Sequence, residues 1–266
     1  MKKIKKILIF TDAFSGGGAE EVMLIFANEL KNDFEIIHVS KWLGPKKIEL
    51  KANQINLKRK TSKACLPDLY TIAKEFNPDF LFSSTGHNNM IIILLKYLLK
   101  KKSKVIIRES SVASQMKSFS LKSRVYDFLL MKFLYRRADK IIAQSNDIYN
   151  DLIHNYKLKK EKIIILNNPV HIDYSYHFND AAKQNQNIKL LTIGRLSKEK
   201  GLFRLINIVK ILPKNYTLQI MGSGVLENEL KEQVKNLDDK VSFLGFMEEH
   251  EKLYLNANTT YIFRGD

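Results

Sequence analysis

Short apolar runs alternate along this chain with longer segments in which apolar residues recur every three or four positions. The short runs are typical of strands buried in a parallel sheet, and the longer segments are typical of amphipathic helices. In the first 170 residues the pattern predicts strands at residues 7–10, 34–39, 80–82, 105–107, 140–143 and 162–166. The helices predicted between them are residues 19–30, 66–76, 88–99, 121–137 and 147–155.

The pattern breaks at residues 171–187, which are polar and show no apolar period. It then restarts, with strands predicted at 189–193, 216–221, 241–244 and 261–263 and helices at 202–212, 226–236 and 248–257. Alternation of strands and helices indicates βαβ units and a parallel sheet. We therefore predict an α/β protein with an N-terminal domain at residues 1–170, a linker at 171–187 and a second domain at 188–266.

Composition adds a strong excess of basic residues. The 266 residues include 44 Lys and Arg against 28 Asp and Glu, a net charge of +16. Either this excess favours an anionic partner, such as a phosphate ligand, acidic lipid or nucleic acid, or it reflects a bias toward Lys in the whole sequence. No nucleic-acid-binding motif accompanies the charge, so nucleic acid is not an expected partner.

The cysteines, the histidines and the longest apolar run limit where the protein can be located and whether it can bind a metal. Cys65 is the only cysteine, so no intramolecular disulfide is possible, which fits a reducing cytoplasm. The most apolar stretch, residues 90–99, is interrupted by Lys96 and is too short for a spanning helix, which needs about 20 residues. We expect a cytoplasmic protein, soluble or peripheral on the inner face of the membrane. The six histidines are scattered without ligand spacing, so no metal is expected.

A candidate phosphate-binding loop follows the predicted strand at 189–193. Residues 194–201 read Gly-Arg-Leu-Ser-Lys-Glu-Lys-Gly. Gly194 lets the backbone approach a ligand closely, and Arg195 and Lys200 supply two cations from one loop. Lys200 could instead be an ordinary lysine at a helix start.

A second glycine loop precedes the predicted helix at 19–30. Gly16 and Gly18 begin a G-x-G-x-x-G pattern, but its sixth position is Glu21. The next strand is followed by Ser40 and Lys41 rather than by an acid that could hold a ribose hydroxyl, so a dinucleotide site is not predicted. The loop either faces a phosphate or sugar from a helix N-terminus or is a plain turn.

Five segments, taken in order, resemble the retaining family-4 glycosyltransferases, which have the GT-B fold of two Rossmann-like domains facing a cleft. They are residues 16–22, 138–145, 165–170, 194–201, and the pair 220–224 with 243–246. Together these segments span nearly the whole chain. Each is weakly specific alone, and their shared order carries the resemblance.

The resemblance implies roles in binding a nucleotide-sugar donor. Arg195 and Lys200 would neutralise the donor diphosphate, which is the leaving group. Gly17 and Gly18 would lie near the diphosphate or the acceptor. Three further glycines would shape the nucleotide pocket, although the last two could simply form a turn: Gly194, Gly222 and Gly224.

Polar residues after two strands are candidates for catalysis, and the second pair of them for the acceptor side. His87 follows the strand at 80–82, where relatives carry a polar residue that contacts the transferred sugar; the alternative is a structural histidine. Arg108 and Glu109 follow the strand at 105–107 and resemble an Arg/Glu pair of some relatives; the alternative is a local ion pair.

The predicted helix at 121–137 interleaves basic and apolar residues, which suits either an anionic membrane surface or a solvated basic face. The basic residues assigned to the membrane surface are Lys122, Arg124, Lys132, Arg136 and Arg137.

The resemblance stops at Phe263, where the family continues into a Pro-Ser loop and a Glu-Gly-Phe-Gly stretch that hold the donor sugar and ribose. We therefore expect a C-terminally truncated chain whose second domain is incomplete. The predicted function is transfer of a sugar from a nucleotide-sugar donor to a lipid-linked glycan acceptor in surface polysaccharide or glycoconjugate assembly, without a cofactor or metal. Truncation would weaken or abolish that activity. The alternative is a non-catalytic fragment that binds the membrane or the acceptor.

Overall fold

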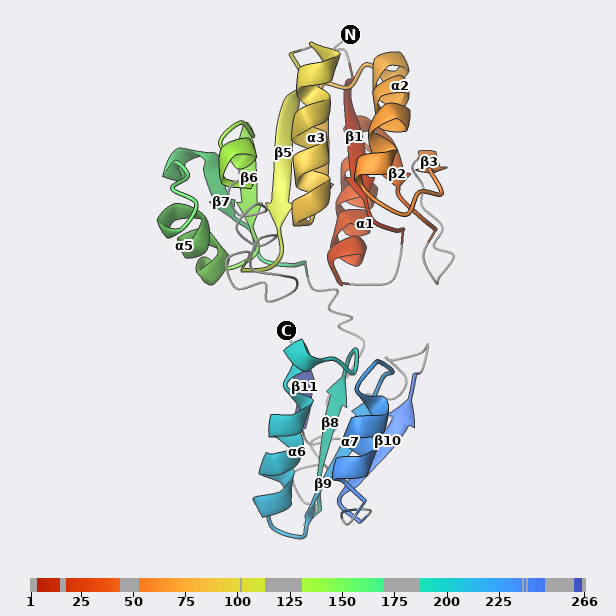
Figure 1. Cartoon of the computed structure of the whole chain (residues 1–266), viewed down its shortest axis with the longest axis vertical. Helices are drawn as coiled ribbons and strands as arrows, with labels where there is room; N and C mark the ends of the chain where they lie inside the picture. The colour runs from red at the N-terminus through yellow and green to blue at the C-terminus, as the bar shows by residue number, and fades with distance from the viewer. Residues whose placement is uncertain are drawn as a thin grey trace. The chain divides into compact units, whose positions relative to one another are not determined.

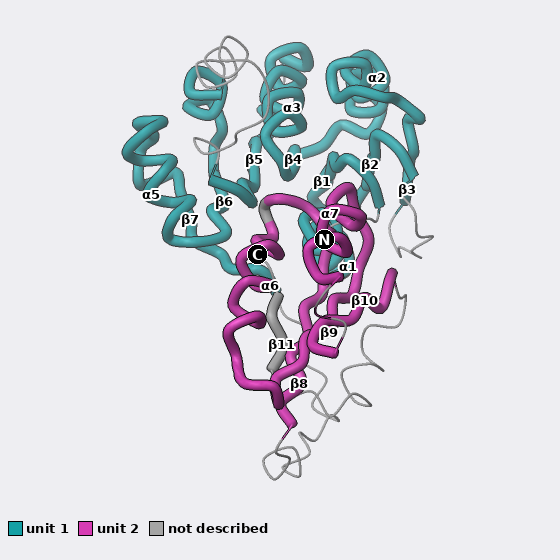
Figure 2. Tube along the Cα trace, turned by 60° about the horizontal axis from the view of Figure 1, so that its bottom comes forward, with its two compact units in different colours: residues 1–171 teal, residues 172–266 magenta. Residues whose placement is uncertain are grey.

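The computed structural model divides the chain into two compact units, residues 1–171 and 172–266 (Figures 1 and 2). It describes residues 4–14, 18–43, 53–100, 102–112, 131–169, 187–235, 237, 239–246 and 261–264, with the backbone alone for Glu199 and 261–264. Three predicted segments lie outside these residues: the linker apart from Asn187, residues 121–130 of the helix at 121–137, and the helix at 248–257.

The first unit is built on a seven-stranded sheet in the order β3-β2-β1-β4-β5-β6-β7, with every pair parallel. Its strands are β1 Lys5–Thr11, β2 Phe34–Ser40, β3 Asn53–Asn56, β4 Phe80–Ser84, β5 Lys104–Glu109, β6 Lys140–Ala143 and β7 Ile163–Ile165.

Helices cover both faces of this sheet, which explains why its strands read as continuous apolar runs. In β1, Ile7 and Ile9 pack with helix α1 on one face, while Leu8 and Phe10 pack into the larger core on the other face. That larger core includes side chains of α2, α3 and α5. The helices are α1 Gly18–Leu30, α2 Leu66–Phe76, α3 Gly86–Leu99 and α5 Asn146–His154, with short 3-10 turns at Lys63–Cys65 and Lys160–Lys162.

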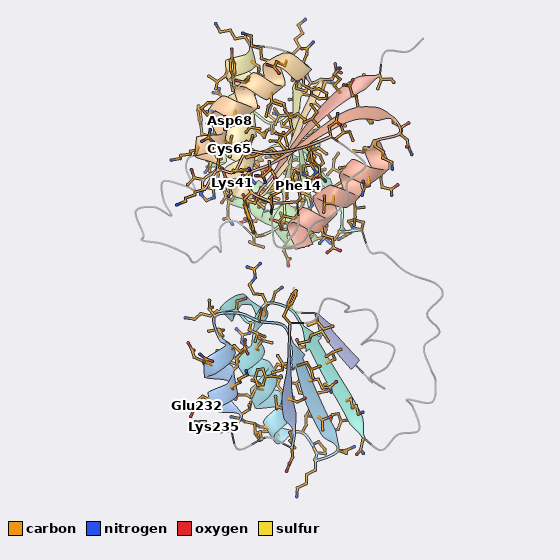
Figure 3. The ribbon with its side chains drawn as sticks, turned by 90° about the vertical axis from the view of Figure 1, so that its right-hand side faces the viewer. Phe14, Lys41, Cys65, Asp68, Glu232 and Lys235 are labelled. Carbon is orange, nitrogen blue, oxygen red and sulfur yellow. The ribbon has the colours of Figure 1, made fainter. Side chains whose placement is uncertain are left out.

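The second unit has a four-stranded parallel sheet in the order β10-β9-β8-β11. Its elements are β8 Ile188–Ile193, a 3-10 turn at Lys198–Lys200, α6 Leu202–Ile211, β9 Tyr216–Met221, α7 Glu227–Gln233, β10 Val241–Gly245 and β11 Tyr261–Arg264. Apolar residues of α6 and α7 form one core with β8, β9 and β10. Side chains occupy the space between sheet and helices in both units (Figure 3).

The strand order reverses beside the first strand of each unit. The chain moves outward from β1 to β2 and β3 and then returns to place β4 on the other side of β1. In the same way β8, β9 and β10 run outward, and β11 lies on the other side of β8. Ligands of open α/β sheets bind at the carboxyl ends of the strands at such a reversal. The α/β class of two parallel-sheet, Rossmann-like units is confirmed.

Glycines allow two loops at the carboxyl edge of the second sheet to touch. A Cβ atom on Gly222 would lie 1.9 Å from the Gly194 carbonyl oxygen, and one on Gly224 would lie 2.4 Å from that of Leu196. The backbone N–H groups of Gly194 and Leu196 donate to Met221 and Ser223 at 3.0 Å. These contacts fix the loop after β8 against the loop after β9.

His38 is a buried titratable group of the first unit. His38 on β2 is fully buried, and its Nε2 lies 2.9 Å from the Thr11 hydroxyl, which itself donates to the Ala13 carbonyl. Nδ1 of His38 is buried and has no partner in the described part of the chain. Burial lowers the pKa of His38 from 6.5 to about 3 because the charged ring loses its hydration.

Replacing Gly222 by Ala should lower the free energy of unfolding by about 2 to 5 kcal/mol, since positive-φ strain adds to overpacking against Gly194. Gly245 is the matched control, because its φ of 72° is also positive but nothing lies within 4 Å of its Cβ position. Gly245→Ala should cost only about 1 to 2 kcal/mol. Urea unfolding measures both, and equal losses would contradict the close contact.

Acid should destabilise the first unit through His38. Between pH 6.5 and 3 the unfolded chain holds the His38 proton and the folded chain does not, so the free energy of unfolding falls as the pH falls. The loss from pH 6.5 to pH 5 should be about 2 kcal/mol. Urea unfolding of His38→Gln should lack this contribution, while the exposed-site control His154→Gln should keep it. If the free energy of unfolding of His38→Gln fell with pH as steeply as that of the wild type, the role of His38 would be refuted.

Candidate functional site

The loop after β8 carries the predicted phosphate-binding cations. Gly194 has a φ of 156°, Arg195 is exposed, and Gly201 adopts the left-handed conformation that ends the 3-10 turn and begins α6. The surface here dips only slightly. The depression is lined by Thr192, Ile193, Gly194, Arg195, Leu196, Lys200, Leu202, Ile220 and Met221.

Lys200 folds back over the start of this loop. A Cβ atom on Gly194 would lie 4.0 Å from Lys200 Cε, so a side chain at position 194 would meet the lysine stem. Arg195 and Lys200 line the same depression although five positions separate them. The turn thus brings both residues to one depression, where their cations could meet an anionic group of a ligand.

The glycines assigned to the nucleotide pocket have a structural task of their own. Gly222 and Gly224 bring the β9 loop against the backbone of Gly194 and Leu196, and neither position leaves room for a Cβ atom. Their small size is therefore required for the loop to exist, whichever ligand binds beside it.

The candidates at helix starts in the first unit are exposed. Gly18 is the first residue of α1, with nothing within 4 Å of its Cβ position, and Gly17 lies outside the described residues. His87 is exposed in the first turn of α3, directly after the carboxyl end of β4.

Arg108 lies at the carboxyl end of β5 and is only 1% exposed. Its guanidinium donates to Ser84 Oγ at 3.1 Å, to Gln144 Oε1 at 2.9 Å and to Asn168 Oδ1. Ser84 is the last residue of β4, and the other two partners follow β6 and β7, so one side chain connects four neighbouring strand ends. Burial lowers the pKa of Arg108 below its usual value, and the nearby Glu109 charge opposes this shift.

Glu109 is buried beside Arg108 and is held from α3 and from the segment before β6. The Tyr135 hydroxyl donates to its Oε2 at 2.6 Å, and the Asn89 amide donates to both Tyr135 Oη and the Arg108 carbonyl at 3.0 Å. Burial raises the pKa of the Glu109 carboxyl, although hydrogen bonds from Tyr135 and from the Ser110 backbone oppose the shift. The carboxyl group therefore makes its contacts inside the protein.

One of the predicted membrane-surface residues, Arg137, lies beside exposed aromatic rings. Arg136 and Arg137 are exposed, and the Arg137 guanidinium lies 4.5 Å from the Phe133 ring centre and 5.6 Å from that of Tyr97. Lys132 is partly buried. Lys122 and Arg124 lie outside the described residues. Exposed apolar side chains of α3 adjoin this site, namely Leu94, Tyr97 and Leu98.

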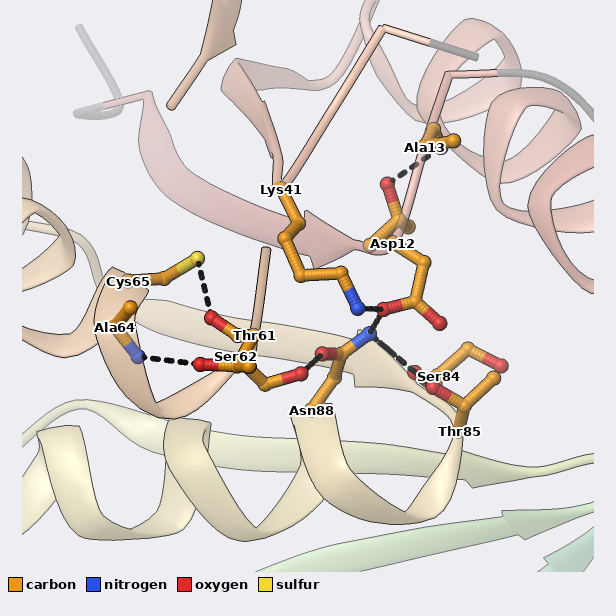
Figure 4. Close-up of polar contacts among 11 residues, drawn as sticks. Asp12, Ala13, Lys41, Thr61, Ser62, Ala64, Cys65, Ser84, Thr85 and Asn88 are labelled. Carbon is orange, nitrogen blue, oxygen red and sulfur yellow. Dashed lines mark hydrogen bonds and ion pairs between the residues drawn. The ribbon is translucent and has the colours of Figure 1, made fainter. Parts of the chain in front are cut away.

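Sequence reasoning missed a polar cluster at the end of β1. Asp12, Lys41 and Asn88 come together there from three segments (Figure 4). The available signal was positional, because Asp12 directly follows β1 and Lys41 directly follows β2.

No group of three or more His, Cys, Asp or Glu side chains in the described part of the chain could hold a metal ion. No helix within the described ranges is both long enough and apolar enough to cross a membrane.

Comparison with curated proteins finds glycosyltransferases. Over 150 residues the chain is 31% identical to the N-acetylgalactosamine-N,N'-diacetylbacillosaminyl-diphospho-undecaprenol 4-alpha-N-acetylgalactosaminyltransferase of Campylobacter jejuni, covering 54% of this chain and 40% of that protein. It is 26% identical over 263 residues to a second enzyme of that organism, GalNAc-alpha-(1->4)-GalNAc-alpha-(1->3)-diNAcBac-PP-undecaprenol alpha-1,4-N-acetyl-D-galactosaminyltransferase. That alignment covers 95% of this chain and 71% of the enzyme. The chain thus spans less than half of the first relative.

Solved structures share the fold. Anabaena Alr3699/HepE, solved in complex with UDP, matches with a TM-score of 0.74 at 18% identity, covering 97% of this chain and 73% of that one. Sucrose-phosphate synthase from Thermosynechococcus elongatus matches with a TM-score of 0.72 at 15% identity, covering 97% and 74%.

Family profiles match in two consecutive parts. The profile of Glycosyl transferases group 1 matches residues 174–263, and that of Glycosyltransferase Family 4 matches residues 16–174. The latter range is more than half of the chain, and the chain therefore belongs to glycosyltransferase family 4.

Proposed function

We propose that this protein transfers a sugar, with retention of configuration, from a nucleotide-sugar donor to a lipid-linked glycan acceptor in surface glycan assembly. The observation that carries the proposal is the loop at 194–201, where a fixed turn brings Arg195 and Lys200 to one depression. The printed names of the two Campylobacter relatives include diphospho-undecaprenol-linked saccharides, and Anabaena Alr3699/HepE was solved with UDP-glucose, which supports both substrate classes.

The two cations act on the leaving group. Negative charge grows on the nucleotide diphosphate as its bond to the sugar breaks, so cations placed there stabilise the transition state more than the ground state. The planar Arg195 guanidinium offers two parallel N–H donors to phosphate oxygens, and the Lys200 ammonium adds a compact charge. With two cations in place, we expect the diphosphate to need no metal ion and the reaction to need no cofactor.

Residues at the carboxyl edge of the first sheet remain candidates for the sugar side of the reaction. The exposed His87 is the candidate for contact with the transferred sugar, and Gly17 and Gly18 for the approach to the diphosphate or the acceptor. Arg108 and Glu109 are buried and bonded to the protein, so we propose that they position neighbouring strand ends of the acceptor side.

We also propose peripheral attachment to an anionic membrane on its cytoplasmic face. Phe133, Tyr97 and Leu98 are 55%, 49% and 49% exposed. Arg137 lies beside the two aromatic rings, and its sequence neighbour Arg136 is exposed as well. Aromatic and apolar side chains next to cations suit the headgroup region of acidic lipids. This surface also favours the second candidate function, a non-catalytic unit that binds the membrane or the acceptor, which would bind acidic vesicles and transfer nothing.

Loss of either loop cation should weaken binding of the donor diphosphate. Arg195→Ala and Lys200→Ala should each raise the Kd for UDP about tenfold to hundredfold, the value of a charge-assisted hydrogen bond, and lower kcat for transfer by about a hundredfold. Calorimetry and a transfer assay with lipid-linked acceptors and a panel of UDP-sugars measure the two effects. Lys198→Ala is the matched control, because Lys198 is exposed in the same 3-10 turn.

If Lys198→Ala weakened UDP binding and transfer as much as Lys200→Ala does, the specific role of Arg195 and Lys200 would be contradicted. Absence of transfer by the wild-type protein with every donor, together with UDP binding, would support the non-catalytic function instead. Chelation by EDTA should leave transfer unchanged, and its loss on chelation would overturn the metal-free mechanism.

Charge reversal on the proposed membrane surface should release the protein from vesicles. Arg137→Glu should lower its partition onto phosphatidylserine-containing vesicles about tenfold or more, since each cation near the surface contributes about 1 kcal/mol and the new charge is repelled. Vesicle sedimentation measures this partition. Lys210→Glu, at an exposed site on α6, makes the same charge change in the other unit and should have little effect. Equal losses would mean that net charge alone drives binding.

A further inference from the structure

A cluster of mutually bonded polar side chains lies at the end of β1, where the strand order of the first sheet reverses. Asp12 follows β1, Lys41 follows β2, and Asn88 lies in the first turn of α3 (Figure 4). The ends of β1 and β2 stay joined beyond the strands, because the N–H groups of Lys41 and Trp42 donate to the Thr11 and Asp12 carbonyls at 3.1 and 3.0 Å. The cluster therefore occupies the place where open α/β sheets bind ligands.

One oxygen of the Asp12 carboxylate is held from two sides. Lys41 Nζ lies 2.6 Å from Asp12 Oδ1, and Asn88 Nδ2 donates to the same atom at 3.1 Å. Asn88 is fully buried and is itself fixed, since it accepts from Ser62 Oγ at 2.7 Å and donates to Thr85 Oγ1 at 3.1 Å. The carboxylate is therefore oriented by a rigid partner.

The other half of the ion pair is available to a ligand. No hydrogen bond within the described residues uses Asp12 Oδ2, and Lys41 Nζ, which has three N–H groups, bonds only to Asp12 there. The side chains of Asp12 and Lys41 are 32% and 17% exposed. The Asp12 carboxylate, which accepts hydrogen bonds, and the Lys41 ammonium, which donates them, thus lie side by side at the surface. Each can make further hydrogen bonds to a ligand.

This combination matches a sugar hydroxyl better than an ion. A hydroxyl donates one hydrogen bond and accepts others, so it can donate to Asp12 Oδ2 and accept from Lys41 Nζ at once. A phosphate would be repelled by the carboxylate, and a metal cation by the ammonium. The only tryptophan of the chain, Trp42, is 47% exposed at the same strand end and offers an apolar surface for a sugar ring.

A strained backbone adjoins the cluster. Thr85 precedes α3 with a φ of 75°, a conformation that β-branched residues rarely adopt, and its hydroxyl takes part in the Asn88 network. Such strain persists where the surrounding contacts fix it, and it occurs often at binding sites.

We propose that Asp12 and Lys41 bind a hydroxyl of the acceptor's terminal sugar and so help to select the acceptor. This inference rests on the proposed function, and it assigns the acceptor-selecting contact to Asp12 and Lys41 rather than to the sequence-predicted His87, Arg108 and Glu109.

The test is the kinetics of Asp12→Asn with a lipid-linked saccharide acceptor. This variant should raise the KM for the acceptor about tenfold to hundredfold, as expected for a lost charged hydrogen bond, and leave the donor KM unchanged. Asp68→Asn is the matched control, because Asp68 is 31% exposed and pairs with Arg59 at 2.8 Å on the same unit. Its acceptor KM should stay at the wild-type value.

Acceptors that each lack one hydroxyl on the terminal sugar identify the contact. For the wild type, one of these deoxy acceptors should raise the acceptor KM about as much as Asp12→Asn raises it for the full acceptor. Asp12→Asn itself should have about the same KM for that deoxy acceptor and for the full acceptor. If Asp12→Asn lowers only the melting temperature and leaves the acceptor KM unchanged, the pair is structural and the inference is overturned while the proposed function stands.

A binding measurement separates this inference from turnover. Octyl glycosides of glucose, galactose, N-acetylglucosamine and N-acetylgalactosamine are titrated into wild type, Asp12→Asn and Asp68→Asn, with saturation-transfer NMR as the readout. Binding that is lost only in Asp12→Asn supports the subsite even if the wild type transfers no sugar, in which case the proposed function fails alone. Absence of binding by the wild type, or equal binding by Asp12→Asn, would overturn the subsite.

Discussion

Parallel pairing is the constraint on which the arrangement of both candidate sites depends. Every strand pair in both sheets is parallel, so within each unit all strands end at one edge. The strand order then reverses beside the first strand of each unit, β1 and β8. Asp12 follows the first of these strands directly, and Gly194 and Arg195 follow the second. The two units thus place their ligand-binding candidates at equivalent positions, with a carboxylate–ammonium pair in one and two cations in the other.

Much of the fold could be predicted because local patterns and global packing agree. α2 begins and ends at the predicted residues, since Pro67 favours its first turn and Asn77 ends it in the left-handed conformation before Pro78. β3 was missed because its sequence, Asn-Gln-Ile-Asn, has no apolar pattern and is specified by its register with β2.

Of the candidate site residues, Arg195 and Lys200 could be found because one loop carries both. The Arg108–Asn168 contact spans 60 positions, and the Asp12–Asn88 contact spans 76, so no local pattern could indicate either.

The two units place their charges in different environments. Arg108 and Glu109 are buried, at 1% and 2% exposure, and the bonds of Arg108 to neighbouring strand ends and of Glu109 to Tyr135 offset the cost of desolvation. Such groups give a site rigidity more readily than they give it ligand contacts. Arg195 is exposed at the depression after β8, where desolvation by a bound diphosphate would strengthen each contact. The glycine contacts between Gly194 and Gly222 keep that loop in one conformation before any ligand arrives.

The central claim is that the loop after β8 binds the diphosphate of a nucleotide-sugar donor. Titration of UDP and GDP into the ¹⁵N-labelled protein, with UMP and uridine in parallel, tests it most directly. We predict that at least one diphosphate shifts the backbone amide signals of Gly194, Arg195 and Gly201 at concentrations where UMP has a much weaker effect and uridine has none. Unchanged signals at these three residues with both diphosphates, or equal shifts with uridine, would contradict the account.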